Sequence, residues 1–301
     1  MMNYRKLGRT GLDVSLLGFG ALEIGRNWPY WRKEKEDFVR PNEADAIKII
    51  HAAVDHGINF FDTAPAYFAS EEILGKALKG IRKNILIATK CGEWFDGEKS
   101  VYDYSYSETK KFIENSLRLL QTDYIDLLQI HSANTNIIRA GETLAAMKDV
   151  QQEGKVRFLG LSTDFEDAAL LAIESKDYDS LQISYNALNL LMTKNVFPQA
   201  EKNNIGMIVK DGMARGMLSE KYSDVADPKQ KEKFERLLKI ASENNLTLSE
   251  LSIAFVLSSP NVSTVIIGTK KREHLNANVS VLQRPVLTQE TLKAIAEVNI
   301  S

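Results

Sequence analysis

The sequence predicts a (β/α)8 barrel preceded by a β-hairpin, and three observations lead to this prediction. Eight short apolar runs recur along the 301 residues, and segments with helical periodicity lie between them. Repeated alternation of strand and helix is typical of a parallel barrel. Most of the runs are apolar at both odd and even positions, as expected of strands buried on both faces. No linker rich in Pro, Gly or Ser divides the chain, so residues 1–301 are expected to form one domain.

The apolar runs set the bounds of the expected strands. These cover residues 16–20, 59–62, 85–90, 125–131, 156–161, 180–183, 206–210 and 264–268. Residues 4–14 precede the first run and have the pattern of a β-hairpin, with Thr10 and Gly11 suited to its turn.

The expected helices begin at polar residues that can cap them. Asn42 can cap residues 43–56, which Gly57 ends. Ser70 opens a helix that closes near Gly80, and Ser107 opens another. Further helical stretches cover about residues 141–153, 166–176, 195–203, 229–258 with a break near 244–245, 272–280 and 288–298.

The composition is that of an ordinary globular protein in a reducing compartment. Apolar residues make up 44% and charged residues 26% of the chain, and the net charge of −2 offers no overall attraction to nucleic acid or an anionic membrane. No apolar run is long enough to span a bilayer, and the first residues lack the apolar stretch of a signal peptide. The single cysteine cannot form an internal disulfide. We therefore expect a cytoplasmic protein, and we predict no metal site.

Four polar residues close or follow successive strands. Asp62, Lys90 and His131 each end an apolar run, and Tyr67 lies in the loop after Asp62. Because the carboxyl ends of barrel strands meet at one end, these side chains are expected to share one pocket.

The four side chains suit the reduction of a carbonyl by a nicotinamide. Tyr67 can protonate the oxygen, although the ordinary pKa of tyrosine of about 10 makes it a weak acid at neutral pH. The Lys90 ammonium is expected to lower that pKa, and Asp62 can hold Lys90 in place. A neutral His131 can donate a hydrogen bond to the substrate oxygen. Taken singly, each residue also has a purely structural explanation. Asp62 and Lys90 can form a structural ion pair, Tyr67 can be a loop aromatic, and His131 can be a core histidine.

Several motifs in order resemble the aldo-keto reductase family. They lie at residues 4–12, 57–67 with Ser70-Glu71 and Leu74-Gly75, 123–131, 154–162, and 267–269 with His274-Leu275 and Asn278. The resemblance covers nearly the whole chain. It implies the same barrel and assigns the same roles to Asp62, Tyr67, Lys90 and His131.

The resemblance also implies that the cofactor lies across the barrel mouth. Gly18-Phe19-Gly20 lacks the third glycine and the acidic residue of a Rossmann motif. The expected cofactor-binding residues are Gly20, Ala21, Ser162, Thr163, Gln182, Lys210, Asp211, Met213, Arg215, Gly268, Thr269, Lys270, Lys271, Arg272, His274 and Asn278.

The chain departs from the family pattern at three of its cofactor positions. Thr163 stands where relatives often have asparagine, and Ala277 where they often have an acidic residue or glutamine. Lys210 replaces an aromatic that stacks on the nicotinamide in many relatives; it can meet a phosphate or pair with Asp211.

The basic run after the last strand bears on the choice of cofactor. Lys270, Lys271 and Arg272 lie at the start of a predicted helix, which suits the 2′-phosphate of NADP; the alternative is a solvated basic turn. NADPH is therefore the expected cofactor, with NAD as an alternative.

Aromatic residues follow the first and third strands. Trp28, Tyr30 and Trp31 form one group, and Trp94, Phe95, Tyr102, Tyr104 and Tyr106 the other. Loops at this end of a barrel build the substrate pocket, although these side chains can equally pack against one another.

The sequence thus predicts an NADP-dependent reductase of a small-molecule aldehyde or ketone. The alternative is a slow nicotinamide-binding sensor or regulatory subunit on the same barrel. A glycosidase would need two suitably separated carboxylates, and the sequence singles out no such pair. Neither the substrate nor the oligomeric state follows from the sequence.

Overall fold

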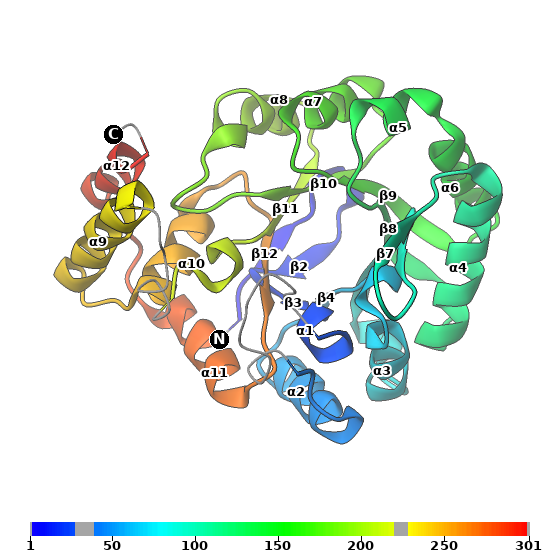
Figure 1. Cartoon of the computed structure of the whole chain (residues 1–301), viewed down its shortest axis with the longest axis horizontal. Coiled ribbons are helices and arrows are strands. Elements are labelled where there is room, and N and C mark those ends of the chain that lie inside the picture. Colours follow the sequence, from blue (N-terminus) through cyan, green and yellow to red (C-terminus); the bar gives the residue numbers. More distant parts are fainter. Residues whose placement is uncertain (1, 28–38, 220–227, 300–301) are drawn as a thin grey trace.

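The computed structural model describes residues 2–27, 39–219 and 228–299. Within them a closed barrel of parallel strands has the order β10-β11-β12-β3-β4-β5-β8-β9, and helices surround it (Figure 1). The strands are β3 Leu17–Gly20, β4 Phe60–Asp62, β5 Leu86–Cys91, β8 Ile125–Ile130, β9 Val156–Ser162, β10 Ser180–Ser184, β11 Gly206–Lys210 and β12 Thr264–Gly268. The predicted (β/α)8 barrel is confirmed, and no predicted strand end is wrong by more than one residue.

The strand register brings the carboxyl ends together. Gly268 pairs with Gly20, and Gly20 with Asp62 across the next interface. Further round the barrel, Lys90 pairs with Gln129, and Ser162 with Gln182. Residues that follow these pairs therefore face one mouth of the barrel.

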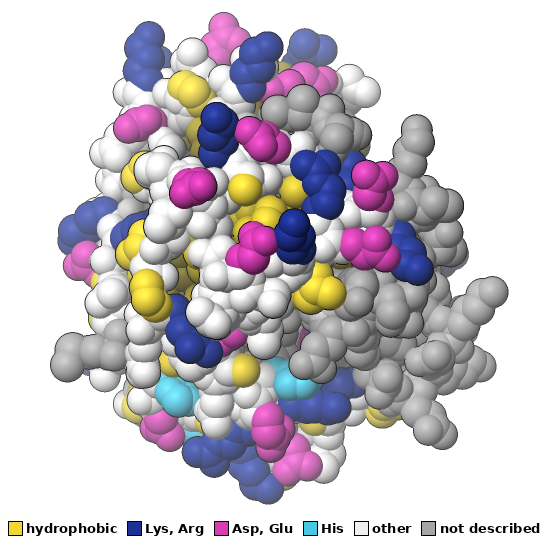
Figure 2. Space-filling view, turned by 90° about the vertical axis from the view of Figure 1, so that its left-hand side faces the viewer, with side chains coloured by type: hydrophobic (Ala, Val, Ile, Leu, Met, Phe, Trp, Pro, Cys, Tyr) yellow, Lys and Arg dark blue, Asp and Glu magenta, His cyan; other side chains and the backbone are white. Residues whose placement is uncertain are grey.

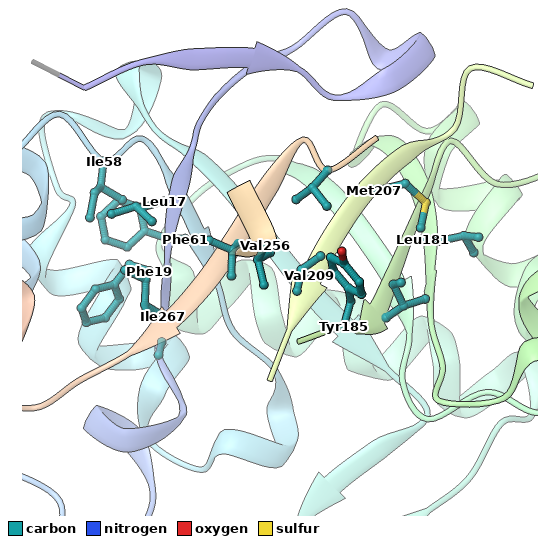
Figure 3. Close-up of a cluster of buried hydrophobic side chains, with 14 of the residues drawn as sticks. Leu17, Phe19, Ile58, Phe61, Leu181, Tyr185, Met207, Val209, Val256 and Ile267 are labelled. Carbon is teal, nitrogen blue, oxygen red and sulfur yellow. The ribbon is translucent and has the colours of Figure 1, made fainter. Parts of the chain in front are cut away.

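The two faces of the strands have different apolar partners. Met207 and Val209 on β11 belong to the large cluster between strands and helices, where Figure 3 also shows Leu17, Phe61 and Ile267. Ile208, between them in sequence, belongs to a smaller cluster with Phe60, Ala88 and Leu127 from other strands. Burial of both faces explains why the strand sequences do not alternate between apolar and polar residues.

The predicted N-terminal hairpin closes the opposite end of the barrel. It consists of β1 Tyr4–Lys6 and β2 Asp13–Ser15, joined by a turn in which Gly11 has a φ of 69°. Leu7 and Val14 are buried in the smaller cluster, and the Arg9 N–H donates to the Asn204 carbonyl just before β11. The hairpin thus covers the amino ends of the strands and leaves the carboxyl ends open.

The helices follow the predicted order. They are α1 Leu22–Gly25, α2 Glu43–Asp55, α3 Ser70–Ala77, α4 Tyr106–Leu120, α5 Thr135–Ala140, α6 Glu142–Gln152, α7 Glu166–Ser175, α8 Val196–Lys202, α9 Pro228–Glu243, α10 Leu248–Ser258, α11 Arg272–Ser280 and α12 Gln289–Glu297. Asn42 caps α2, and the break between α9 and α10 includes Asn244 and Asn245, after which Thr247 caps α10 with a capping box.

Four short elements and one cap differ from the prediction. Ser105, not Ser107, caps α4, because its side chain accepts a hydrogen bond from the Glu108 N–H. The segment after β5 is an antiparallel pair, β6 Glu93–Phe95 with β7 Ser100–Tyr102, rather than an irregular loop. α1 and α5 were not predicted, since four and six residues are too few to show a helical period.

No described helix is long and apolar enough to cross a membrane. On the face shown in Figure 2, basic and acidic side chains are interspersed.

Candidate active site

Lys90 lies at the centre of a buried polar cluster below the barrel mouth. Its Nζ donates to both carboxylate oxygens of Asp62, at 2.8 and 2.7 Å, and to the Thr63 carbonyl at 3.0 Å. The same Nζ lies 3.2 Å from the Tyr67 hydroxyl. The ends of β4 and β5 and the loop after β4 supply these groups, so three of the four predicted residues are in direct contact.

The ion pair is enclosed by protein and satisfied by amides. Lys90 is 0% and Asp62 3% exposed. Gln182 Nε2 donates to Asp62 Oδ1 at 2.7 Å, and Gln129 Nε2 lies 3.4 Å from the same oxygen. Burial lowers the pKa of Lys90, while Asp62 opposes that effect. If either charge were removed, the other would be buried without a partner, which is unfavourable. The pair therefore holds the Asp62 and Lys90 side chains against each other.

Tyr67 ends a short 3-10 turn, Pro65–Tyr67, that projects it over Lys90. Burial raises the pKa of Tyr67 well above its usual value, and the charges of Asp62, Glu93 and Asp211 raise it further. The expected lowering of this pKa by Lys90 is therefore wrong. The carboxylate of Asp62 offsets the Lys90 charge, and burial disfavours the phenolate.

His131 follows β8 and completes the group. Its ring meets the Tyr67 ring edge-on, with centroids 5.9 Å apart. The Cys91 carbonyl accepts from its N–H, and its own carbonyl accepts from the Tyr104 hydroxyl at 2.9 Å. Burial, followed by Lys90, Lys210 and Arg26, lowers the pKa of His131 well below its usual value. The imidazole is accordingly neutral at pH 7, as the sequence predicted.

A polar network continues from Asp62 around the barrel. Ser162 Oγ donates to Gln182 Oε1 at 3.1 Å, and Lys210 Nζ lies 3.4 Å from Ser162 Oγ. Lys210 also forms an ion pair with Asp164 at 3.1 Å. The two interpretations offered for Lys210 were a phosphate contact and a pair with Asp211; the acidic partner is Asp164 instead.

Asp211 has other partners. It accepts from the Ser184 hydroxyl at 2.9 Å and lies 3.4 Å from Arg215 Nε. Both Asp211 and Arg215 have positive φ, so the chain turns sharply after β11. Thr163 is buried, and its hydroxyl donates to the Ala133 carbonyl at 2.7 Å. That hydroxyl proton is therefore already used within the protein.

The predicted anion site lies at the start of α11. Lys271, which precedes this helix, gives it no side-chain cap, so the first N–H groups of the helix are left for another acceptor. Lys271, Arg272 and His274 are exposed, whereas Lys270 donates to the Val39 carbonyl at 3.1 Å. Uncapped N–H groups beside exposed cations suit a phosphate.

The remaining predicted cofactor residues line the mouth or the core beneath it. Gly20 and Gly268 end neighbouring strands, and the Ala21 N–H donates to the Asp62 carbonyl at 2.9 Å. Thr269 is buried in a turn with Lys271, Asn278 is buried on α11, and Met213 packs partly against the main core. The group around Lys90 and the α11 cations lie on different elements of the barrel.

Sequence reasoning missed four polar residues at this site. They are Arg26, Gln129, Asp164 and Glu93, whose carboxylate lies 3.1 Å from His131 Nδ1. Gln129 carried the clearest signal, as a polar residue inside an apolar run. Arg26 and Asp164 lie in loops and Glu93 in the short strand β6, and the contacts of all three depend on the closed barrel.

Part of the aromatic group lies beside this site. Phe95 packs edge-on against Phe68 and under the Arg26 guanidinium, whose carbon lies 3.7 Å from the ring centre. Trp94 packs on Phe112 of α4 instead. Trp28, Tyr30 and Trp31 lie outside the described residues.

A cleft of about 790 Å³ opens next to the Lys210 network. Asp164, Ser184, Asp211 and Arg215 line one side of it, and residues of α9 the other. None of the four predicted catalytic residues is among its described lining. Within the described residues no cluster of His, Cys, Asp and Glu is arranged to hold a metal ion.

Comparisons with known proteins agree with this geometry. A model of the aldo/keto reductase family matches residues 16–300. An uncharacterized oxidoreductase of Bacillus subtilis (strain 168), YqkF, is 31% identical over 309 residues, covering 98% of this chain and 95% of the relative. A probable voltage-gated potassium channel subunit beta of Arabidopsis thaliana is 30% identical over 335 residues, covering 99% of this chain and 96% of the relative.

A solved structure extends the agreement to three dimensions. The holo form of the aldo-keto reductase AKR11C1 from Bacillus halodurans has a TM-score of 0.85 and 28% identity, covering 99% of this chain and 96% of the other. Strand order, the predicted motifs and the family match all lead to one conclusion: the chain belongs to the aldo-keto reductase family, whose members are NAD(P)H-dependent oxidoreductases of carbonyl compounds.

Proposed function

We propose that this protein reduces an aldehyde or ketone to an alcohol, with NADPH as hydride donor and Tyr67 as general acid. One observation carries the proposal. The Tyr67 hydroxyl, the Lys90 ammonium and the Asp62 carboxylate form one buried group, with Lys90 Nζ 3.2 Å from the phenol and 2.7 Å from the carboxylate. A structural ion pair alone would not require a phenol at the mouth of the barrel.

The residues can move one proton to the substrate oxygen. NADPH, when bound, supplies a hydride to the carbonyl carbon, so negative charge develops on the oxygen. The raised pKa of Tyr67 keeps its proton in place at neutral pH. Transfer remains favourable because an alkoxide is about as basic as hydroxide, the conjugate base of water with a pKa of about 15.7. Lys90 stabilises the phenolate that forms, and Asp62 holds Lys90 against the phenol.

Two groups of residues support the cofactor part of the proposal. Ser162 and Gln182 present polar atoms beside Asp62 and suit the nicotinamide carboxamide. Lys271 and Arg272 at the uncapped start of α11 suit the 2′-phosphate, which favours NADP over NAD. We extend the proposal to a cytoplasmic protein whose residues 1–301 act as one domain.

Stopped-flow kinetics test the proposed reaction. The NADPH-loaded protein is mixed with a panel of aldehydes and ketones, and nicotinamide absorbance is followed with ordinary and 4-deuterated NADPH. We expect carbonyl-dependent oxidation with a primary isotope effect on the first turnover. Oxidation that is no faster with any carbonyl than without one would contradict the proposal.

A second candidate is a nicotinamide-binding regulatory subunit with slow turnover. The similarity to a potassium channel subunit beta over 99% of this chain favours it. Lys210, in place of a stacking aromatic, is consistent with cofactor binding that serves something other than rapid turnover. The same kinetics separate the candidates, since a regulatory subunit would oxidise one equivalent of NADPH slowly and turn over little.

A further inference from the structure

Glu93 lies beside His131, and the backbone before it restricts its position. It follows Gly92, whose φ of 93° favours glycine, and a Cβ at Gly92 would lie 2.3 Å from the Tyr104 ring. Glu93 begins β6 and is 7% exposed. The Ser132 hydroxyl donates to its Oε2 at 3.3 Å. The position of this carboxylate is thus fixed from two sides.

The carboxylate faces one ring nitrogen of His131. Glu93 Oε2 lies 3.1 Å from Nδ1, a hydrogen-bond distance. Nδ1 is buried and has no partner of good hydrogen-bond angle, so a small rotation of either side chain would complete the bond. A neutral imidazole carries its proton on one nitrogen only. With the proton on Nε2, the Nδ1 lone pair would face the carboxylate oxygen.

We propose that Glu93 is a positioning residue that holds the proton of neutral His131 on Nδ1, so that Nε2 accepts a hydrogen bond at the reaction centre. Neutral His131 then binds a hydroxyl group, such as that of Tyr67 or of the alcohol. It donates to a carbonyl oxygen only as the imidazolium. The expected role of neutral His131 as a donor is thereby replaced by that of an acceptor.

The charges around His131 decide when the imidazolium forms. Lys90 on β5, Lys210 on β11 and Arg26 after α1 oppose the cation, and burial opposes it most. Glu93 on β6 is the carboxylate closest to the ring in the described structure, and Tyr67 after β4 contributes a neutral phenol. Removing the Glu93 charge should shift the His131 titration to lower pH, by about one pH unit or more for an opposite charge within 4–6 Å.

Nitrogen NMR of the ligand-free chain tests the tautomer directly. The protein has four histidines, so a long-range proton–nitrogen spectrum of ¹⁵N-histidine protein is simple, and His131→Gln assigns the signal. We expect the Nδ1–H form in the wild type. In Glu93→Gln the amide can donate to Nδ1, so the Nε2–H form should appear. Ser132→Ala keeps the carboxylate and is the matched control, with the wild-type tautomer expected.

Two results would overturn the proposal. A wild-type spectrum dominated by the Nε2–H form would overturn the proposal without any variant. This outcome therefore does not depend on whether Glu93→Gln folds. The same tautomer and titration midpoint in a folded Glu93→Gln would do so as well. The catalytic consequence rests on the proposed function, but the tautomer does not; an inactive protein with an Nδ1–H imidazole would contradict the function alone. Where the protein is active, Glu93→Gln should also move the acidic limb of the pH profile to lower pH.

Discussion

The two ends of the proposed site hold their charges in opposite ways. Lys90 is fully buried and bound to three residues of the chain, whereas Lys271 and Arg272 are exposed at the start of α11. A buried charge must be satisfied by the protein itself, so its geometry is fixed before a ligand arrives. An exposed cation is solvated and gains a fixed partner only when an anion binds. Substitutions at the first end should affect chemistry and stability, and those at the second should affect affinity alone.

The largest effect is expected from Tyr67→Phe, which removes the transferable proton and keeps the ring. General acid catalysis contributes typically 10²–10⁴-fold, so the hydride-transfer rate should fall by roughly that factor while NADPH affinity changes little. Single-turnover kinetics and a cofactor titration measure the two quantities. Tyr102→Phe removes a phenol that is 55% exposed and serves as the control. Near-native turnover in Tyr67→Phe would show that another group supplies the proton.

Lys90→Met should damage both turnover and folding. It leaves the Asp62 carboxylate buried without its cation, and such a loss costs about 3–5 kcal/mol. Lys76→Met is the matched control, because it removes a lysine that pairs with Glu43 and Glu72 on the surface. Denaturant unfolding should therefore separate the two variants clearly. Equal stability would mean that the Asp62–Lys90 pair does not fix the local geometry, and an unchanged pH–rate profile would remove Lys90 from the proton transfer.

Neighbouring residues Glu71 and Glu72 extend the comparison to pH. Glu71 is fully buried beside Thr89, and burial raises its pKa from 4.5 to about 7, whereas Lys76 lowers the pKa of exposed Glu72. Since folding favours protonated Glu71, stability should fall as pH rises from 4.5 through 7, by up to about 1.4 kcal/mol per pH unit. Thermal unfolding of Glu71→Gln from pH 5 to 8 should lack this loss, and Glu72→Gln should keep it. A wild-type melting temperature that rises over this range would contradict the sign.

The exposed end should respond only in cofactor affinity. Neutralising Lys271 and Arg272 together removes cations that suit the 2′-phosphate, and hydrogen bonds to charged groups contribute about 1.5–3 kcal/mol each. NADPH affinity should therefore fall roughly tenfold or more, NADH affinity little, and added salt should narrow the wild-type difference. Isothermal titration with both cofactors decides this. Equal losses of NADPH and NADH affinity, or a wild-type preference for NADH, would indicate that these cations form only a solvated turn.

Lys210 lies between the two extremes and should give the smallest effect. Its Nζ is close to Ser162, beside the proposed carboxamide site, and is offset by Asp164 at 3.1 Å. A cation there opposes the positively charged ring of oxidised cofactor. Lys210→Met should therefore improve NADP⁺ affinity relative to NADPH by a few-fold, as measured by titration. A relative loss of NADP⁺ affinity would indicate that the lysine contacts a phosphate instead.

The sequence by itself determined the barrel and two of its central contacts, Lys90 with Asp62 and Lys90 with Tyr67. Apolar runs of strand length at regular spacing are compatible with few folds other than a parallel barrel, because each run must be buried on both faces. The residues Asp62, Lys90 and Tyr67 could be placed together because they end or follow adjacent strands. Helix caps such as Asn42 were equally local, since the cap and the N–H group that it binds lie three residues apart.

Only the tertiary structure decided the partners and the electrostatics. Lys210 pairs with Asp164 rather than adjacent Asp211, because the turn after β11 directs Asp211 to Ser184 and Arg215. Glu93 and His131 are 38 residues apart in sequence, so no rule of local spacing predicts their contact. The pKa of Tyr67 rises where proximity to Lys90 predicted a fall, because burial enters only when the barrel closes around the charges. Residue types and strand order are properties of the chain, whereas desolvation and the choice among nearby partners are properties of the folded interior.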